Sequence, residues 1–347
     1  MLEELIDELL SYLQLYPKPK TGMPNDKPIK VAILDDYQGV ALQLADWAVL
    51  KGKADITVFR DHLSDPVALV ERLKPFDVVC VMRERTPFSR SILEQLPNLK
   101  LLASTAARNA SIDLDATHER GITVCGTGYS PHGAIELTWA LILAIVRNVP
   151  AEIASLRAGQ WQISVGADLK GKTIGVVGLG NIGAKIARIA LAFGMNVLAW
   201  SQNLTRETAE EHGARLVGKE ELFRHADIVT VHLVLSRRTE GVIGATELNL
   251  MRPSAYLVNT SRGPLVDETA LINALKSRTI AGAALDVYNI EPLPESHPLR
   301  SLDNVLATPH IGFVTEDTYK IFYRDTVENI AAWLSGKPVR VATSRNA

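Results

Sequence analysis

The sequence predicts an α/β protein with two doubly wound parallel sheets, one in each of two domains. Short β-branched apolar runs alternate with helical patterns over most of the chain, which is the element order that produces parallel sheets. The chain has 347 residues, more than one hydrophobic core normally serves. A glycine-rich turn within the second series of strands predicts that this half has a binding role of its own.

Residues 1–28 are expected to form an amphipathic helix followed by a linker. Apolar residues recur at helical spacing from Leu2 to Leu13, with acidic residues between them, and the pattern stops before Pro17. The following Pro- and Lys-rich stretch is typical of an extended linker. We expect the helix to dock on the body of the chain or on another subunit; a dedicated partner is the alternative.

The first series of strands defines one domain. Its five expected strands span residues 30–34, 56–59, 78–81, 101–104 and 123–125. A long helix over residues 136–147 then leads into the second series. Six strands are expected there, over residues 173–177, 197–200, 228–231, 255–258, 281–285 and 305–307.

A final helix, residues 315–334, is expected to return to the first domain. The first domain would then be discontinuous, with residues 29–128 joined by residues 316–347, and the second domain would span residues 129–315.

Composition excludes several classes of function. The formal net charge is −2, and no basic run is present, which argues against nucleic-acid binding. Cys80 and Cys125 are the only cysteines and lie in apolar stretches, which disfavours a disulfide framework and fits a reducing compartment, the cytoplasm. No uncharged apolar stretch reaches the roughly eighteen residues of a membrane span, and the acidic N-terminus does not resemble a secretory signal.

The glycine turn is the most specific local motif. It reads Gly178, Leu179, Gly180, Asn181, Ile182 and Gly183 and lies between the strand 173–177 and an expected helix over residues 182–192. In such a turn the first glycine permits a tight bend, the second lets the backbone approach a pyrophosphate, and the third lets helix pack on strand. The helix N-terminus would then offer unpaired N–H groups to the phosphates of a dinucleotide.

Arg262, Glu291 and His310 form a set that suits reduction of a 2-keto acid. Arg262 follows one strand of the second domain, and a guanidinium can hold a carboxylate through paired hydrogen bonds. His310 follows another strand and can exchange a proton near neutral pH. Glu291 lies in a loop that can reach the histidine, and a carboxylate beside an imidazole favours its protonated form.

Each of these residues has a simpler explanation when it is taken alone. Arg262 would form a salt bridge, His310 would be a packing residue, and Glu291 would be an ordinary loop residue. Their joint position at the strand ends of one domain favours catalysis. A zinc site made by His297, His310 and Glu291 is the competing explanation, and its ligands lack close spacing.

These motifs together resemble those of the D-isomer-specific 2-hydroxyacid dehydrogenases. The matching segments are residues 178–183, 257–268, 284–292 and 304–312, and the resemblance extends to the first domain through residues 99–102, 112–113 and 121–124. The resemblance implies a Rossmann-type cofactor domain inserted into a flavodoxin-like substrate domain, a cleft that closes over the substrate, and a homodimer built through the cofactor domains.

The resemblance also implies the roles of individual residues. Arg262 would bind the substrate carboxylate, His310 would be the acid/base with Glu291 as its partner, and Asp286 would contact the nicotinamide carboxamide. Thr260, in the same motif as Arg262, is expected at the cofactor.

Two segments depart from the family pattern. At the end of the strand 197–200, where an acidic residue normally binds the ribose, the chain has Ser201 and, shortly after, Arg206. This favours NADP over NAD, although Ser201 can equally hydrogen-bond an unmodified ribose. In the substrate loop, residues 104–111, the family's glycines are missing, but backbone N–H groups such as those of Ala107 and Arg108 can still bind substrate. Arg83 and Arg108 are candidates to recognise a larger acidic or polar substrate; a surface ion-pair cluster of Arg83 with Glu84 is an equally good explanation.

The sequence therefore predicts an NAD(P)-dependent oxidoreductase of the glyoxylate or hydroxypyruvate reductase type, with no metal. Two alternatives stay open. One is a D-3-phosphoglycerate dehydrogenase, and the other is a dinucleotide-sensing binding protein like the C-terminal-binding-protein corepressors.

Overall fold

The computed structural model describes residues 27–342, so the helix expected between Leu2 and Leu13 lies outside the described residues. The chain divides into two compact units. Unit 1 comprises the residues up to Ser130 together with those from Glu316 onward, and unit 2 comprises Pro131–Thr315.

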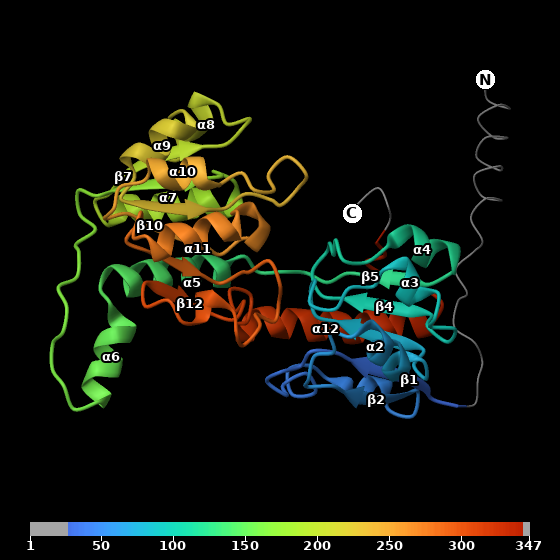
Figure 1. The fold of residues 1–347 in the computed structure, drawn as a ribbon. Coiled ribbons are helices and arrows are strands. Elements are labelled where there is room, and N and C mark those ends of the chain that lie inside the picture. Colours follow the sequence, from blue (N-terminus) through green and yellow to red (C-terminus); the bar gives the residue numbers. More distant parts are fainter. Residues whose placement is uncertain (1–26, 343–347) are drawn as a thin grey trace, which may run out of the picture. The chain divides into compact units, whose positions relative to one another are not determined.

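Unit 1 is a five-stranded parallel sheet with the strand order β2-β1-β3-β4-β5 (Figure 1). Its strands are β1 (Ile29–Ile33), β2 (Ala54–Val58), β3 (Val78–Val81), β4 (Leu101–Ser104) and β5 (Thr123–Cys125). Its helices are η1 (Trp47–Leu50), α2 (Pro66–Leu73), α3 (Arg90–Leu93), α4 (Leu114–Glu119) and α12 (Glu316–Leu334).

The strands β3, β4 and β5 of unit 1 are buried along their whole length, whereas the edge strand β2 alternates between partly buried and exposed residues. Alternate strand residues such as Val79 and Leu102 pack with buried residues of α2, α3 and α4 in one cluster. The long helix α12 contacts β4 and η1, so it completes the unit whose strands come from residues 29–125.

Unit 2 is a seven-stranded parallel sheet with the order β12-β11-β10-β9-β6-β7-β8. Its strands are β6 (Thr173–Val177), β7 (Asn196–Trp200), β8 (Arg215–Leu216), β9 (Ile228–Val231), β10 (Tyr256–Asn259), β11 (Gly282–Leu285) and β12 (Val305–Ala307). Its helices are α5 (His132–Val146), α6 (Val149–Arg157), α7 (Asn181–Ala192), α8 (Arg206–Glu211), α9 (Lys219–His225), α10 (Ala245–Leu250), η2 (Gly263–Leu265), α11 (Glu268–Lys276) and η3 (Pro298–Arg300).

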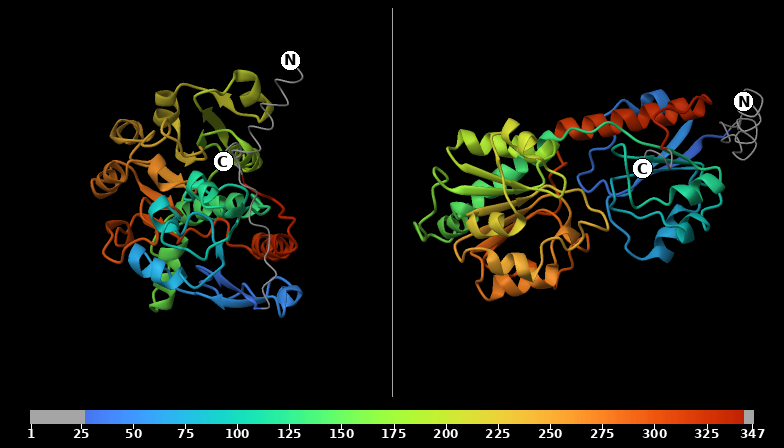
Figure 2. Two further views of the ribbon diagram at one scale, coloured as in Figure 1. Left: turned by 90° about the vertical axis from the view of Figure 1, so that its right-hand side faces the viewer. Right: turned by 90° about the horizontal axis from the view of Figure 1, so that it is seen from above.

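Helices lie on both sides of this sheet, as the right-hand view of Figure 2 shows. Buried residues of α9, α10 and α11 pack on one face, and those of α5 and α7 pack on the other. The predicted fold class, α/β with two doubly wound parallel sheets, is confirmed.

The structure differs from the sequence prediction in three elements. The second sheet has seven strands instead of six, because β8 is two residues long and gives no recognisable pattern. Helix α5 begins at His132 rather than at residue 136. Its first turn includes Gly133, where an added Cβ would lie 2.7 Å from the carbonyl oxygen of Gly312. Helix α6 was not predicted; it follows Asn148, whose φ of 52° ends α5.

Within residues 27–342, no single helix is long and apolar enough to cross a membrane. Helices α5 and α6 reach that length and composition only as a pair bent by 63°, and α5 is a core helix of unit 2.

Candidate active site

The glycine turn joins β6 to α7, and two of its glycines are required by close packing. Gly178 has a φ of 100°, and an added Cβ would lie 2.8 Å from the main-chain carbon and oxygen of His232. At Gly183 an added Cβ would lie 2.0 Å from the carbonyl oxygen of Gly178. Gly180, in contrast, is exposed and has nothing within 4 Å of an added Cβ. The turn is thus closely packed at Gly178 and Gly183 and open to solvent at Gly180.

Helix α7 presents its N-terminus at this opening. Gly180 is the N-cap and has no side chain to bind the first N–H groups, Asn181 is exposed, and Ile182 is half-buried. The sheet order changes direction here, since β6 lies between β9 and β7. Ligands of such sheets bind at this switch point, and unpaired N–H groups at a helix start favour an anion. The residues present therefore fit a dinucleotide pyrophosphate.

The segment after β9 borders the same turn, and the sequence analysis missed it. Val234 is 84% exposed although it is apolar, and Thr239 holds its loop by donating to the Val234 carbonyl at 2.7 Å. The sequence feature that could have identified this segment is the apolar run that continues beyond the strand end at Val231. His232 begins this segment; its Nε2 lies 2.8 Å from the Thr230 hydroxyl, and burial lowers its pKa to about 3, so the ring is neutral.

The end of β7 carries the residues expected at the cofactor ribose. Ser201 directly follows Trp200 and is half-buried, and no acidic residue occurs between Ser201 and Arg206. Arg206 is the first residue of α8 and is exposed. The segment from Ser201 to Arg206 therefore has no carboxylate that would repel an additional phosphate.

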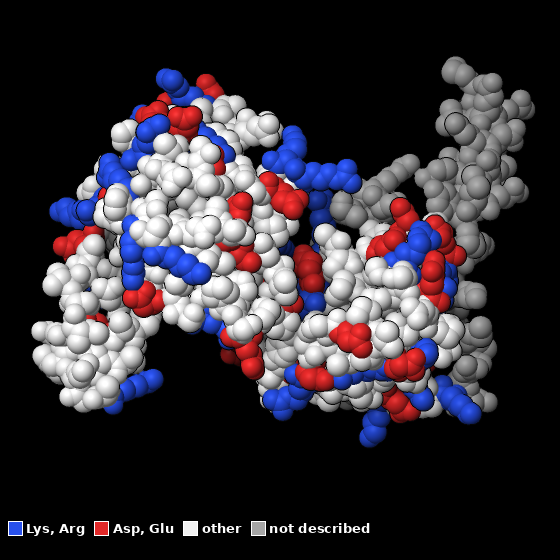
Figure 3. Space-filling view, viewed as in Figure 1, with Lys and Arg blue, Asp and Glu red and all other residues white. Residues whose placement is uncertain are grey.

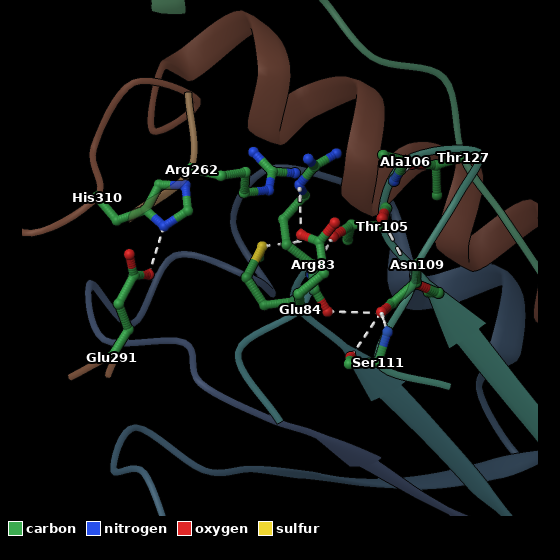
Figure 4. A network of polar contacts seen from close by, with 12 residues as sticks. Arg83, Glu84, Thr105, Ala106, Asn109, Ser111, Thr127, Arg262, Glu291 and His310 are labelled. Carbon is green, nitrogen blue, oxygen red and sulfur yellow. Dashed lines mark hydrogen bonds and ion pairs between the residues drawn. The ribbon is translucent and has the colours of Figure 1, made fainter. Parts of the chain in front are cut away.

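His310 and Glu291 are paired directly (Figure 4). His310 Nδ1 lies 2.5 Å from Glu291 Oε2, and the other carboxylate oxygen accepts the main-chain N–H of Tyr288 at 2.9 Å. Both side chains are partly exposed, at 21% and 28%. The carboxylate thus fixes the ring at Nδ1, which leaves Nε2 as the position for proton exchange.

Asp286 holds the loop that carries His310. His310 has a φ of 50°, which is disfavoured for a residue with a Cβ. The buried Asp286 carboxylate accepts from the Thr308 hydroxyl at 2.6 Å and from the N–H groups of Ile311 and Gly312 at 2.8 Å each. Burial raises the pKa of Asp286. Both of its oxygens support the loop, and its expected contact with the nicotinamide stays a prediction.

Arg262 follows β10, the strand next to β11, and its main chain is fixed by a buried amide. Asn259 is 1% exposed; its Nδ2 donates to the Arg262 carbonyl at 2.9 Å, and its Oδ1 accepts from Ser261 N–H at 3.1 Å. The next residue, Gly263, touches the loop that carries Glu291, because an added Cβ would lie 2.1 Å from the carbonyl carbon of Tyr288. The loops after β10 and β11 are therefore in close backbone contact.

Thr260 does not direct its hydroxyl toward the strand-end opening. Its Oγ1 lies 2.7 Å from Thr138 Oγ1 on α5, and Thr138 donates its own proton to the Ala134 carbonyl at 2.6 Å. The Thr260 hydroxyl must then donate to Thr138. The Thr260 hydroxyl can then only accept a further hydrogen bond, and its expected role at the cofactor stays a prediction.

The candidate substrate residues of unit 1 follow β3 and β4. Arg83 is half-buried, and Ala107 and Arg108 are exposed in the loop after β4. The N–H groups of Ala107 and Arg108 make no hydrogen bond to any residue between 27 and 342. A small hollow of about 20 Å³ lies against this loop, bordered by Arg108, Asn109 and Ile112 among others. The loop thus offers two free donors without the glycines common in the family.

The zinc alternative has no support in the geometry. His297 Nε2 lies 3.3 Å from Glu268 instead of joining Glu291 and His310. Among the described residues, no group of three or more His, Cys, Asp and Glu side chains is arranged to hold a metal ion.

Comparisons with known proteins place the chain in one family. Residues 139–312 match the model of the "D-isomer specific 2-hydroxyacid dehydrogenase, NAD binding domain". The chain is 40% identical over 273 residues to a D-3-phosphoglycerate dehydrogenase of Methanocaldococcus jannaschii, which covers 78% of this chain and 52% of that protein. It is 39% identical over 256 residues to a glyoxylate reductase of Aeropyrum pernix, covering 71% and 76%.

A crystal structure of a phosphoglycerate oxidoreductase from Vibrio cholerae has a similar fold. The TM-score is 0.85 at 41% identity, over 88% of this chain and 99% of that one. The chain thus spans about half the length of the Methanocaldococcus relative and nearly all of the crystallised one.

Proposed function

The chain belongs to the D-isomer-specific 2-hydroxyacid dehydrogenase family, and from this premise we propose that it reversibly reduces a small 2-keto acid to the D-2-hydroxy acid. Glyoxylate and hydroxypyruvate are the proposed type of substrate. The observation that carries the proposal is the Glu291–His310 pair on a loop held by buried Asp286. The net charge of −2 supports a small-molecule partner rather than nucleic acid, and the two free, buried cysteines fit the cytoplasm.

His310, Glu291 and Arg262 have different roles in the proposed reaction. The nicotinamide cofactor, when bound, supplies the hydride to the keto carbon. His310 Nε2 donates the proton to the oxygen of that carbon, and the Glu291 carboxylate at Nδ1 stabilises the ring while it is positively charged. In the oxidative direction the same ring accepts the proton. Arg262 holds the substrate carboxylate, so the keto group meets the histidine in one orientation.

The glycine turn would hold the cofactor. Gly180, Asn181 and Ile182 surround the N-terminus of α7, where the pyrophosphate is expected, and Gly178 and Gly183 allow the close packing beneath it. Asp286 and the main chain of Thr260 are the proposed contacts at the nicotinamide end.

Arg83 and the N–H groups of Ala107 and Arg108 are the proposed substrate contacts of unit 1. The two N–H groups are unpaired among the described residues and suit an anionic oxygen. Arg83 suits a second acidic or polar group on a larger substrate.

We propose NADP as the preferred cofactor, because Ser201 replaces the usual acid and Arg206 is exposed nearby. Ser201→Asp is then expected to shift the ratio of kcat/KM for NADPH over NADH at least about tenfold toward NADH, since a carboxylate repels the additional phosphate. The ratio is measured by initial rates with both cofactors. Asn196→Asp, at the opposite end of β7, makes the same charge change and should leave the ratio as it is. An unchanged ratio in Ser201→Asp would contradict the assignment of this strand end.

We further propose a homodimer through unit 2, carried by the surface of α6 and the segment after it, residues 149–165. Its exposed apolar side chains are Val149, Ile153, Leu156, Trp161, Ile163 and Val165. In Figure 3 the lobe that carries α6 shows little charge on the face in view. A contiguous apolar surface of this kind is typical of a subunit interface.

Val165→Glu is the test of the dimer, because Val165 is 96% exposed and its substitution leaves the subunit's own packing intact. The expected result is a dimer dissociation constant raised about tenfold or more by sedimentation equilibrium. Val67→Glu, at a valine of α2 that is 69% exposed in unit 1, is the matched control. A wild-type protein that sediments at the subunit mass of 37.9 kDa contradicts the proposal.

A panel of 2-keto acids with NADPH and NADH tests the function itself. Oxidation of the reduced cofactor, followed by absorbance, is expected with glyoxylate or hydroxypyruvate. A chain that instead oxidises D-3-phosphoglycerate and reduces neither small acid is the phosphoglycerate enzyme. Tight cofactor binding without turnover of any acid would support the dinucleotide-sensing alternative.

A further inference from the structure

Arg83 adopts a backbone conformation that its neighbours impose. Its φ is 54°, in the left-handed region that residues with a Cβ avoid. Its N–H donates to Thr105 Oγ1 at 2.8 Å, and its carbonyl accepts from Asn109 Nδ2 at 2.6 Å. Both partners lie in the segment after β4. The direction in which the Arg83 side chain leaves the main chain is therefore set by that segment.

Asn109 uses its full hydrogen-bonding capacity in this link (Figure 4). Nδ2 also donates to Ser104 Oγ at 3.0 Å, and Oδ1 accepts from the N–H and the hydroxyl of Ser111 at 3.0 and 2.6 Å. A carbonyl can only accept, and an N–H can only donate, so the contacts with Arg83 and Ser111 determine which end of the carboxamide is which. Few other side chains can serve both neighbours at once.

The Arg83 side chain is held at its other end as well. Its Cζ lies 5.4 Å from the centroid of the Tyr129 ring, and its Nε lies 3.5 Å from Glu84 Oε2. Only 15% of the side chain is exposed. With both the main chain and the guanidinium fixed, the arginine loses little conformational freedom when it binds a ligand.

The loop with the free N–H groups is fastened to the same framework. Ala106 has a φ of 65°, its N–H donates to Thr127 Oγ1 at 2.7 Å, and its carbonyl accepts from Thr127 N–H at 3.1 Å. Asn109 holds the other end of the loop. The side chains of Thr127 and Asn109 thus hold this loop at two points, and Ala107 and Arg108 lie between them.

We infer that Asn109 is a positioning residue that links Arg83 to the loop of Ala107 and Arg108. Its hydrogen bonds keep the distance between the Arg83 guanidinium and the free N–H groups constant, so that both contact the substrate together. The inference rests on the proposed function, because it assumes that Arg83 contacts the substrate. It makes substrate affinity depend on a carboxamide that does not itself touch the substrate.

Asn109→Asp is the most direct test, because aspartate keeps the acceptor for Ser111 and removes the two donors. With the best 2-keto acid of the panel, KM is expected to rise about tenfold while kcat stays within about threefold, a size usual for residues coupled in one network. Thr105→Val removes the other bond to Arg83 and should change KM in the same direction. Asn98→Asp is the matched control; Asn98 donates to the Lys74 carbonyl at 2.8 Å on the surface of unit 1, and its substitution should leave KM unchanged.

A double-mutant cycle with Arg83→Ala separates positioning from a general structural effect. If Asn109 acts through Arg83, the KM of the double variant rises by clearly less than the product of the two single increases, and any remaining effect of Asn109→Asp comes from the loop of Ala107 and Arg108. An additive effect, or an unchanged KM in both Asn109→Asp and Thr105→Val, overturns the inference. Wild-type protein that turns over no 2-keto acid overturns the proposed function instead, so the two failures are distinguishable.

Discussion

His310→Asn is expected to lower kcat/KM for 2-keto acid reduction about a thousandfold, within the range that general acid–base catalysis contributes. Asparagine keeps a polar side chain on the loop that Asp286 supports, but it cannot carry the proton. The cofactor is expected to bind normally, because the glycine turn is formed by other residues. Initial rates and a fluorescence titration with reduced cofactor measure the two quantities separately.

His297→Asn is the matched control for this variant. His297 lies in the same unit and is also paired with a carboxylate, Glu268, at 3.3 Å. Its substitution is expected to leave kcat within about threefold, since no role in proton transfer is proposed for it. If His310→Asn kept more than about a tenth of the wild-type rate, the proton would have to come from another group.

Arg262→Gln should have the second large effect, again about a thousandfold on kcat/KM. Two charge-assisted hydrogen bonds to a carboxylate contribute about 4 kcal/mol together, and the neutral amide loses most of that. Arg262→Lys restores the charge without the paired geometry and is expected to recover about tenfold of the loss. Steady-state kinetics over a range of substrate concentrations should show the effect mainly in KM.

Arg252→Gln controls for the loss of a positive charge from unit 2. Arg252 Nη1 binds Asp227 Oδ1 at 3.2 Å and is half exposed, so this substitution should leave KM as it is. A normal KM in both Arg262→Gln and Arg262→Lys would show that the substrate carboxylate is bound elsewhere.

Asp286 shows how a local sequence motif can hide its structural role. The family resemblance placed it at the nicotinamide, and only the folded chain shows that both its oxygens accept hydrogen bonds from the segment around His310. Those partners are more than twenty residues away in the sequence, so no spacing rule connects them. Thr260 is similar, since its hydroxyl is directed to a helix 122 residues earlier.

The sequence by itself determined the fold class and the order of most strands along the chain, and it predicted Glu291 and His310 as partners, which the structure brings together. Alternating apolar runs and helical patterns are local properties, and so are the glycines at a strand end. Three features were decided by the tertiary structure alone: β8 joins the sheet, Gly263 packs on Tyr288, and the Asn109 side chain donates a hydrogen bond to the Arg83 carbonyl. These depend on contacts between segments far apart in the chain, where packing and hydrogen-bond satisfaction, rather than local propensity, select the conformation.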